Sequence, residues 1–168
     1  MTETDIAYHD VETLKSVLVG RKIVSVQDGF KPEPTWYSRK LRQLSYTLDD
    51  GTVLKATESD GGCSCANGCF SVAPGDGEEA LDRAIGATIL NVEVEELAKD
   101  WEADHPVHAL IEPGSISSGD ATIRLFVYTE LGKATLVESE GSDNGWYGWG
   151  FWMSVDRPET AETAEAVS

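Results

Sequence analysis

The feature that most constrains the fold is a repeated order of elements in the two halves of the chain. The segment LKSVLVGRKIVSV in the first half matches LDRAIGATILNV in the second half by residue type, which places Gly20 opposite Gly86 and Ile23 opposite Ile89. Further along, SYTLDDGTVLKATESDGG matches FVYTELGKATLVESEGSDNG. Self-similarity of this kind indicates that one supersecondary unit occurs twice.

The spacing of apolar residues predicts the elements of each half. Helical spacing predicts a helix over residues 11–18, with Asp10 or Thr13 as its cap and Gly20 as its end. Asp50-Gly51 is a strong hairpin signal. Alternation predicts strands over residues 22–27, 41–48, 52–57 and 69–72. The second half reads the same way, with a helix over 78–85, strands over 88–95, 123–129 and 134–138, and an insertion over 96–119.

These elements predict an α+β fold, in which two pseudo-repeated α-β-β-β-β units form one mostly antiparallel, sheet-like or barrel-like domain. The first unit spans residues 10–76 and the second spans residues 77–155. Residues 1–9 are expected to be a flexible arm, and residues 156–168 a disordered acidic tail that lacks the apolar content to order itself. The alternative is a chance similarity between two β-meanders.

The net charge of −17 narrows the range of partners. It argues against direct binding to bulk DNA and to anionic membranes, because both present phosphate charge of the same sign. It permits binding to a basic partner, including a nucleic-acid-binding protein, although the favoured interpretation of the charge is solubility through self-repulsion. No apolar run is long enough to span a bilayer, and the acidic N-terminus has no signal-peptide pattern, so a cytoplasmic location is expected.

The segment GSDNGWYGWGFWMSV, residues 141–155, is the strongest candidate for a binding site. On a strand, one face would carry Tyr147, Trp149, Phe151, Met153 and Val155, and the other Trp146, Gly148, Gly150, Trp152 and Ser154. The first interpretation is structural: the tryptophans fill space left by the glycines. The second is an aromatic floor for a small ligand beside a polar lip, formed by Trp146, Tyr147, Trp149, Trp152, Asp143 and Asn144.

Three cysteines, Cys63, Cys65 and Cys69, lie in one short segment. Thiolates this close are able to share a tetrahedral zinc ion, with His105 as fourth ligand and His9 or His108 as alternatives. The spacing lacks the usual pairs of C-x-x-C, so the favoured interpretation is three reduced cysteines that pack as small apolar residues. No other cofactor is expected.

The sequence predicts that the protein is not an enzyme. It contains no P-loop, no dinucleotide-binding glycine motif, no nucleophile elbow and no H-E-x-x-H motif. The carboxylates Glu93, Glu95 and Glu96 are expected to lie on a solvated strand edge, where they would not form an acid/base pair.

The order of several short motifs resembles a family of small phage and bacterial proteins of unknown function. In that family the motifs are a hydrophobic-Gly-Lys-Thr-Ile opening, a D-G hairpin, an acidic segment that contains cysteine, a Leu-Ile-Gly stretch before a strand and a late S-N-G-aromatic-aromatic loop. They correspond to Leu18–Ile23, Asp50-Gly51, Gly62–Cys65, Ala84–Ile89 and Asp143–Tyr147. The likeness covers most of residues 11–155, and the chain departs from it in its third cysteine, its basic segment 31–42, its extra tryptophans and its acidic tail.

The resemblance implies a phage-encoded accessory protein, of an actinobacterial phage given the acidic, Ala/Gly-rich composition, and it brings no activity with it. Together with the charge, it leads to the expectation of a non-enzymatic protein that binds a basic host protein through an acidic surface in the host cytoplasm. The partner is expected to be a protein of the host or of the phage. One alternative is a binder of a small anionic ligand or nucleotide that uses the tryptophan strand. Another is a component of the virion or of its assembly.

Overall fold

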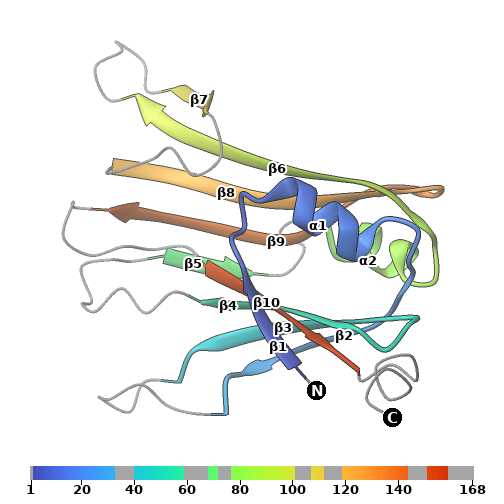
Figure 1. The fold of residues 1–168 in the computed structure, drawn as a ribbon. Helices are drawn as coiled ribbons and strands as arrows, with labels where there is room; N and C mark the ends of the chain where they lie inside the picture. Colours follow the sequence, from blue (N-terminus) through green and yellow to red (C-terminus); the bar gives the residue numbers. More distant parts are fainter. Residues whose placement is uncertain are drawn as a thin grey trace.

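The computed structural model describes residues 2–32, 40–58, 68–71, 77–100, 107–111, 119–143 and 151–158. These residues form two antiparallel five-stranded sheets and two short helices (Figure 1). The first sheet has the order β1-β10-β4-β3-β2 and the second has the order β5-β9-β8-β6-β7. The elements are β1 (Thr2–Ile6), α1 (Val11–Leu18), β2 (Ile23–Phe30), β3 (Arg42–Leu48), β4 (Val53–Glu58), β5 (Gly68–Ser71), α2 (Gly77–Ala84), β6 (Ile89–Asp100), β7 (Val107–Ile111), β8 (Gly119–Thr129), β9 (Gly132–Asp143) and β10 (Phe151–Arg157).

The predicted α+β fold with a single sheet or barrel is wrong. The structure is mostly β, with two separate sheets, and each helix has only eight residues. The sequence predicts too few strands, because the prolines and glycines of residues 96–119 indicate an insertion. That stretch contains the end of β6, all of β7 and the first residue of β8. Strand content depends on pairing partners more than on local composition.

The first helix follows from local signals and is confirmed. Asp10 caps α1, since its carboxylate accepts a hydrogen bond from the Thr13 amide at 3.2 Å. The helix then buries Leu14, Val17 and Leu18, which lie on one side at helical spacing.

Each half of the chain contributes its last strand to the sheet of the other half. The strands β2, β3 and β4 form a meander in the first sheet, but β5 pairs with β9 in the second sheet. In the same way β6, β8 and β9 neighbour one another in the second sheet, whereas β10 pairs with β4 in the first. The division of the chain between residues 76 and 77 stays a prediction, but neither half forms its sheet alone.

The two sheets meet where β2 and β6 begin. The amide of Gly20 donates to the carbonyl of Ile89 at 2.8 Å, and the amide of Gly86 donates to the carbonyl of Ile23 at 2.9 Å. Both glycines have a φ of 84°, a conformation that other residues adopt only with strain. The glycines that the sequence match places opposite each other therefore make the same turn and the same bond.

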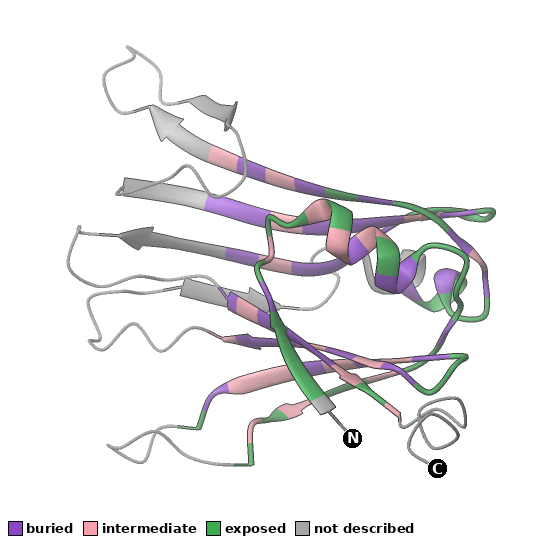
Figure 2. Ribbon diagram, in the orientation of Figure 1, coloured by how far each residue is buried: buried purple, intermediate pink, exposed green. Residues whose placement is uncertain are grey.

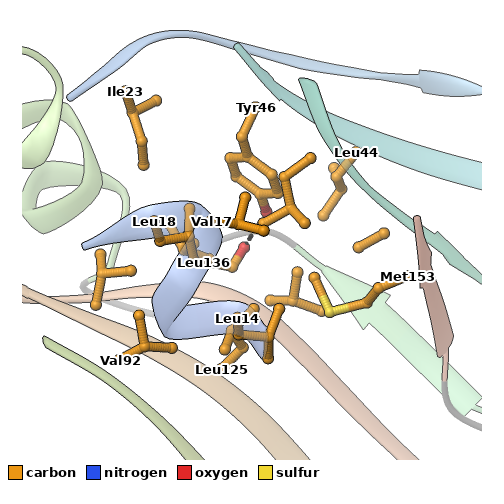
Figure 3. Packing of buried hydrophobic residues seen from close by; sticks show 14 of the residues in the cluster. Leu14, Val17, Leu18, Ile23, Leu44, Tyr46, Val92, Leu125, Leu136 and Met153 are labelled. Carbon is orange, nitrogen blue, oxygen red and sulfur yellow. Dashed lines mark hydrogen bonds between the residues drawn. The ribbon is translucent and has the colours of Figure 1, made fainter. Parts of the chain in front are cut away.

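The core lies between the sheets and extends under both helices (Figures 2 and 3). Tyr46 on β3 is fully buried, and its hydroxyl donates to the carbonyl of Leu136 on β9. The pairing of β8 with β9 slips at Leu125 and Phe126, so Leu136 is the extra residue of a bulge. A bulge residue loses a ladder partner, and the Tyr46 hydroxyl satisfies its carbonyl inside the core.

The first and last strands pair with each other in the first sheet. Strand β1 pairs with β10 where the sequence suggests only a flexible arm, and Ile6 is buried there. Ser154 on β10 donates to the Glu3 carboxylate at 2.7 Å. The strand β10 also continues to Arg157, two residues into the segment predicted as a tail. Residues 159–168 lie outside the described residues.

Candidate functional site

Trp152 is the candidate ligand-binding residue whose surroundings the structure describes. It lies on the outer face of β10, whereas Phe151, Met153 and Val155 are buried on the inner face, as the alternation predicts. The Lys31 ammonium lies 5.0 Å from the centroid of the Trp152 ring. At this distance a cation is attracted to the face of an indole ring. Trp152 therefore combines a flat apolar surface with an adjacent positive charge.

A hollow of about 520 Å³ opens beside Trp152. It is lined by Asp5, Ile6, Ala7, Trp152 and Met153. The hollow exists because β1 ends at Ile6, which pairs with Met153, while β10 extends two residues further to Phe151. Within the described strands, this part of β10 therefore has a partner only on its β4 side. The volume is in the range of small-ligand sites.

The structure does not describe the side chains of the other predicted ligand-binding residues. Asp143 ends β9, but its side chain is not among those described. The positions outside the described residues are Asn144, Trp146, Tyr147 and Trp149.

The predicted metal ligands also lie largely outside the described residues. Cys69 belongs to β5, with a side chain that is not described, whereas Cys63, Cys65 and His105 fall in undescribed stretches. Within the described part of the chain, no group of three or more histidine, cysteine or carboxylate side chains is placed to hold a metal ion. The zinc interpretation stays a prediction.

The outer face of the second sheet carries a row of charged residues across three strands. The guanidinium of Arg124 on β8 lies 3.3 Å from Glu95 on β6 and 2.5 Å from Glu138 on β9. Burial acts to lower the pKa of Arg124, but the hydrogen bonds and charges of these two carboxylates raise it. One base is thus held between two acids.

A second contact group on the same face covers an aromatic ring. Phe126 is buried although it lies outside the main core cluster, and the Lys133 ammonium is 3.8 Å from its ring centroid. Beside it, the Tyr128 hydroxyl donates to Glu93 at 2.6 Å, and this bond raises the pKa of Tyr128. The exposed Lys133 side chain therefore places its ammonium over both rings.

Glu96 is a functional candidate that the sequence analysis missed. Its side chain is fully buried, so the expectation of a solvated edge is wrong for this residue. The Tyr8 hydroxyl donates to its carboxylate at 3.0 Å, and the Tyr8 ring packs 5.4 Å from that of Phe151. The sequence contains a signal for the burial of Glu96, because Val92, Val94 and Glu96 follow one another at a spacing of two. Residues at this spacing share one face of a strand, which in β6 is the inner face.

Exposed acids gather along the N-terminal segment. Glu3 and Asp5 lie on β1, an edge strand of the first sheet, and Asp10 and Glu12 follow at the start of α1. We call these four residues the acidic edge. The Glu12 side chain is 89 % exposed and that of Glu3 is 50 % exposed. The hydrogen bonds from Thr13 lower the pKa of Asp10, so this carboxylate stays charged.

Among the described residues there is no helix with the length and apolar character needed to cross a bilayer. Neither the curated proteins nor the solved structures contain a match to the chain. A family model does match residues 16–153, from the last turn of α1 to the third residue of β10, and it is described as a domain of unknown function, DUF7448. This agrees with the expected membership of a family of unknown function, and the match covers more than half of the chain. The chain therefore belongs to the DUF7448 family.

Proposed function

We propose that this is a non-enzymatic accessory protein that binds a basic protein partner through its acidic surface. The supporting observation is that two basic side chains are each paired with two carboxylates of the same chain. Arg124 lies between Glu95 and Glu138, and Lys55 lies within 4.0 Å of both Glu3 and Asp156. Because these two bases are held by acids of the same chain, neither is free to repel a basic partner, and the net charge of −17 attracts one.

The acidic edge is the surface we propose for this contact. Its four carboxylates belong to a strand edge and to the first turn of a helix, so they lie along one continuous stretch of chain. A basic segment laid along the outer side of β1 would meet these charges in order. Such charge complementarity raises association rates and makes binding depend strongly on salt.

The family match supports a shared domain without a known activity, and the finer assignment is our proposal. We propose that the protein is encoded by a phage, acts in the cytoplasm of the host cell, and has a host protein as its partner. The ordered motifs that resemble small phage and bacterial proteins support this origin. Co-purification with phage particles would instead indicate a component of the virion.

Binding to a lysine-rich peptide tests the proposal. We expect fluorescence anisotropy with a labelled peptide to show binding that weakens as ionic strength rises from about 0.01 M to about 0.15 M, where the screening length falls from ~30 Å to ~8 Å. The double variant Asp5→Asn, Glu12→Gln should bind more weakly than the wild-type protein.

A matched control removes two charges elsewhere. Asp82 and Glu93 are exposed and lie away from the acidic edge, on α2 and β6. The double variant Asp82→Asn, Glu93→Gln should bind the peptide nearly as well as the wild-type protein. Equal weakening in both double variants would show that only the overall charge matters, and binding that ignores salt would contradict the electrostatic proposal.

A second candidate function is binding of a small anionic ligand at Trp152. The observations that favour it are the Lys31 ammonium over the Trp152 ring and the adjacent hollow. An aromatic face next to a cation is suited to a nucleotide base and its phosphate. Titration with AMP should quench tryptophan fluorescence in the wild-type protein, and Trp152→Phe should remove most of the quenching.

Lysine variants decide whether the charge at this position matters. Lys31→Gln should weaken the AMP response, whereas Lys22→Gln, which removes an exposed lysine at the start of β2, should leave it unchanged. Binding of AMP at Trp152 is excluded if AMP does not quench the tryptophan fluorescence of the wild-type protein. It is also excluded if AMP quenches the fluorescence of Trp152→Phe as strongly as that of the wild-type protein.

A further inference from the structure

A second hollow, of about 350 Å³, lies between the end of α1, the turn that joins β3 to β4, and the end of β10. Val17 on α1 and Thr52 after the turn line it with buried side chains, whereas Arg21 and Arg157 line it with exposed ones. Small-ligand sites span about 300–1,000 Å³. The hollow is therefore large enough for a small molecule and too small for a folded protein.

The backbone fixes the points from which both arginines reach the hollow. The carbonyl of Arg21 accepts a hydrogen bond from the amide of Ile89 at 2.9 Å. Arg157 is the last residue of β10. Pro158, which follows it, lies against the turn, since a side-chain carbon added at Gly51 would be 3.4 Å from its Cγ atom. The two guanidinium groups thus come from separate, anchored parts of the fold.

Asp50 holds one of the two arginines. Its carboxylate lies 3.4 Å from Nε of Arg21 and accepts a hydrogen bond from the amide of Thr52 at 2.9 Å. Burial acts to raise the pKa of Asp50, but the hydrogen bonds from Thr52 and the charge of Arg21 lower it, so the carboxylate stays charged. A guanidinium carries more N–H donors than one carboxylate can accept, so Arg21 keeps donors for a ligand.

The charge of this hollow is opposite to that of the chain as a whole. Among the described residues that line it, Asp50 is the only acid, against the two arginines. Arg157 makes no ion pair within the part of the chain that the structure describes. The chain has 13 basic and 30 acidic residues, so two arginines at one hollow reverse the charge locally. A positive hollow of this kind attracts an anion.

A smaller hollow occupies the matching place in the second half of the chain. It measures about 220 Å³, lies between the end of α2 and the turn that joins β8 to β9, and contains Arg83 and Lys133. The Lys133 ammonium already lies 3.8 Å from the centroid of the Phe126 ring. The hollow at Arg21 and Arg157 has the larger volume and two guanidinium groups, so it is the better site for a ligand.

We propose that this hollow binds the phosphate group of a small phosphorylated molecule through Arg21 and Arg157. A phosphate presents several acceptor oxygens, so it can accept hydrogen bonds from two guanidinium groups at once. Val17 and Pro158 add apolar surface beside these charges, which suits the carbon part of such a molecule. The hollow shares no residue with the acidic edge or with the hollow at Trp152, so the proposal does not depend on the functions proposed above.

Titration of the isotope-labelled full chain with inorganic phosphate, followed by NMR at constant ionic strength, is the test. We expect the amide signals of Arg21, Thr52 and Arg157 to shift and to saturate. Arg21→Gln and Arg157→Gln should each raise the dissociation constant about tenfold, because each removes a charged hydrogen-bond donor. Propyl phosphate should bind more tightly than inorganic phosphate, and acetate, with a single charge and fewer oxygens, should bind more weakly.

The matched control is Arg83→Gln, which removes an exposed arginine from the smaller hollow. It should leave the dissociation constant measured at the Thr52 amide nearly unchanged, and the spectrum of each variant shows whether it is folded. Equal weakening by Arg83→Gln would overturn the proposal, because overall charge would then explain the binding. Three other results would overturn it as well: no saturable shift at the three amides, an affinity that both arginine variants leave unchanged, or propyl phosphate that binds no tighter than acetate.

Discussion

Tyr46 is the side chain that joins the two sheets inside the core. Burial, and then the charge of Asp28, raises its pKa well above the usual value of 10. Tyr46→Phe would leave the Leu136 carbonyl without this donor in a buried place. We expect the free energy of unfolding to fall by about 1–3 kcal/mol at neutral pH, which urea denaturation measures.

The raised pKa of Tyr46 also gives the direction of the pH dependence. In the unfolded chain the phenol loses its proton near pH 10, whereas in the folded protein it stays protonated to higher pH. Its contribution to stability is therefore complete below about pH 10 and is lost as the pH rises further. The difference between wild type and Tyr46→Phe should shrink at about pH 11. Tyr128→Phe, at an exposed hydrogen bond, is the control and should change stability by less than about 0.5 kcal/mol.

Gly86 tests the role of backbone conformation at the junction. Its φ is +84°, whereas Gly29 on β2 has no positive φ, and in both cases an added side-chain carbon would meet no atom within 4 Å. Gly86→Ala should therefore lower the free energy of unfolding by about 1–2 kcal/mol through backbone strain alone. Gly29→Ala introduces the same methyl group without the strain and should cost clearly less. Equal losses of stability in the two variants would contradict this explanation.

Among the elements, the strand β1 lies where the sequence predicts a flexible arm. Deleting residues 2–6 exposes the strand edge of β10 and removes the burial of Ile6. The buried isoleucine alone contributes about 1.5–3 kcal/mol, so we expect a clear fall of the urea midpoint. Deleting residues 159–168, a part of the predicted tail, should leave the midpoint unchanged. A midpoint that is equally insensitive to both deletions would support an arm that contributes no stability.

Elements with local signals could be predicted from the sequence, whereas those set by distant partners could not. The cap at Asp10, the turn at Gly20 and the hairpin at Asp50-Gly51 each depend on a few neighbouring residues, and all three are present. The strand β1 exists only because β10 lies beside it, and the paired residues Thr4 and Val155 are 151 residues apart, which is nearly the whole chain. Local composition carries no information about such a partner.

In the candidate site, too, the features set by neighbouring residues could be predicted and those set by distant strands could not. The inward and outward alternation of β10 could be predicted, and it places Trp152 outside as expected. The hollow beside it could not, because it depends on where β1 ends relative to β10. The exposure of Val24 and Leu90 could not be predicted either, since two register slips decide that these side chains face solvent.

At the scale of the whole molecule, the exchange of strands makes each half depend on the other. The pairings β1 with β10, β4 with β10 and β5 with β9 all join residues far apart in the chain. The core cluster likewise takes residues from both sheets. Forming contacts between residues so far apart costs a large amount of chain entropy, because long loops must close. Folding should therefore be slow compared with that of a helical protein of the same size.

A complementation experiment tests this dependence directly. We expect the separate fragments 1–76 and 77–168 to lack a cooperative unfolding transition, because each would expose one face of the core and an unpaired last strand. When the two fragments are mixed, exchange of β5 and β10 should restore the circular dichroism spectrum of the intact chain and a cooperative transition. Leu125→Asp in the second fragment should abolish this recovery, since Leu125 is fully buried between the sheets. A fragment that unfolds cooperatively by itself would show that its half of the chain is an independent domain. In that case the exchanged strand would not be required for the folding of that half.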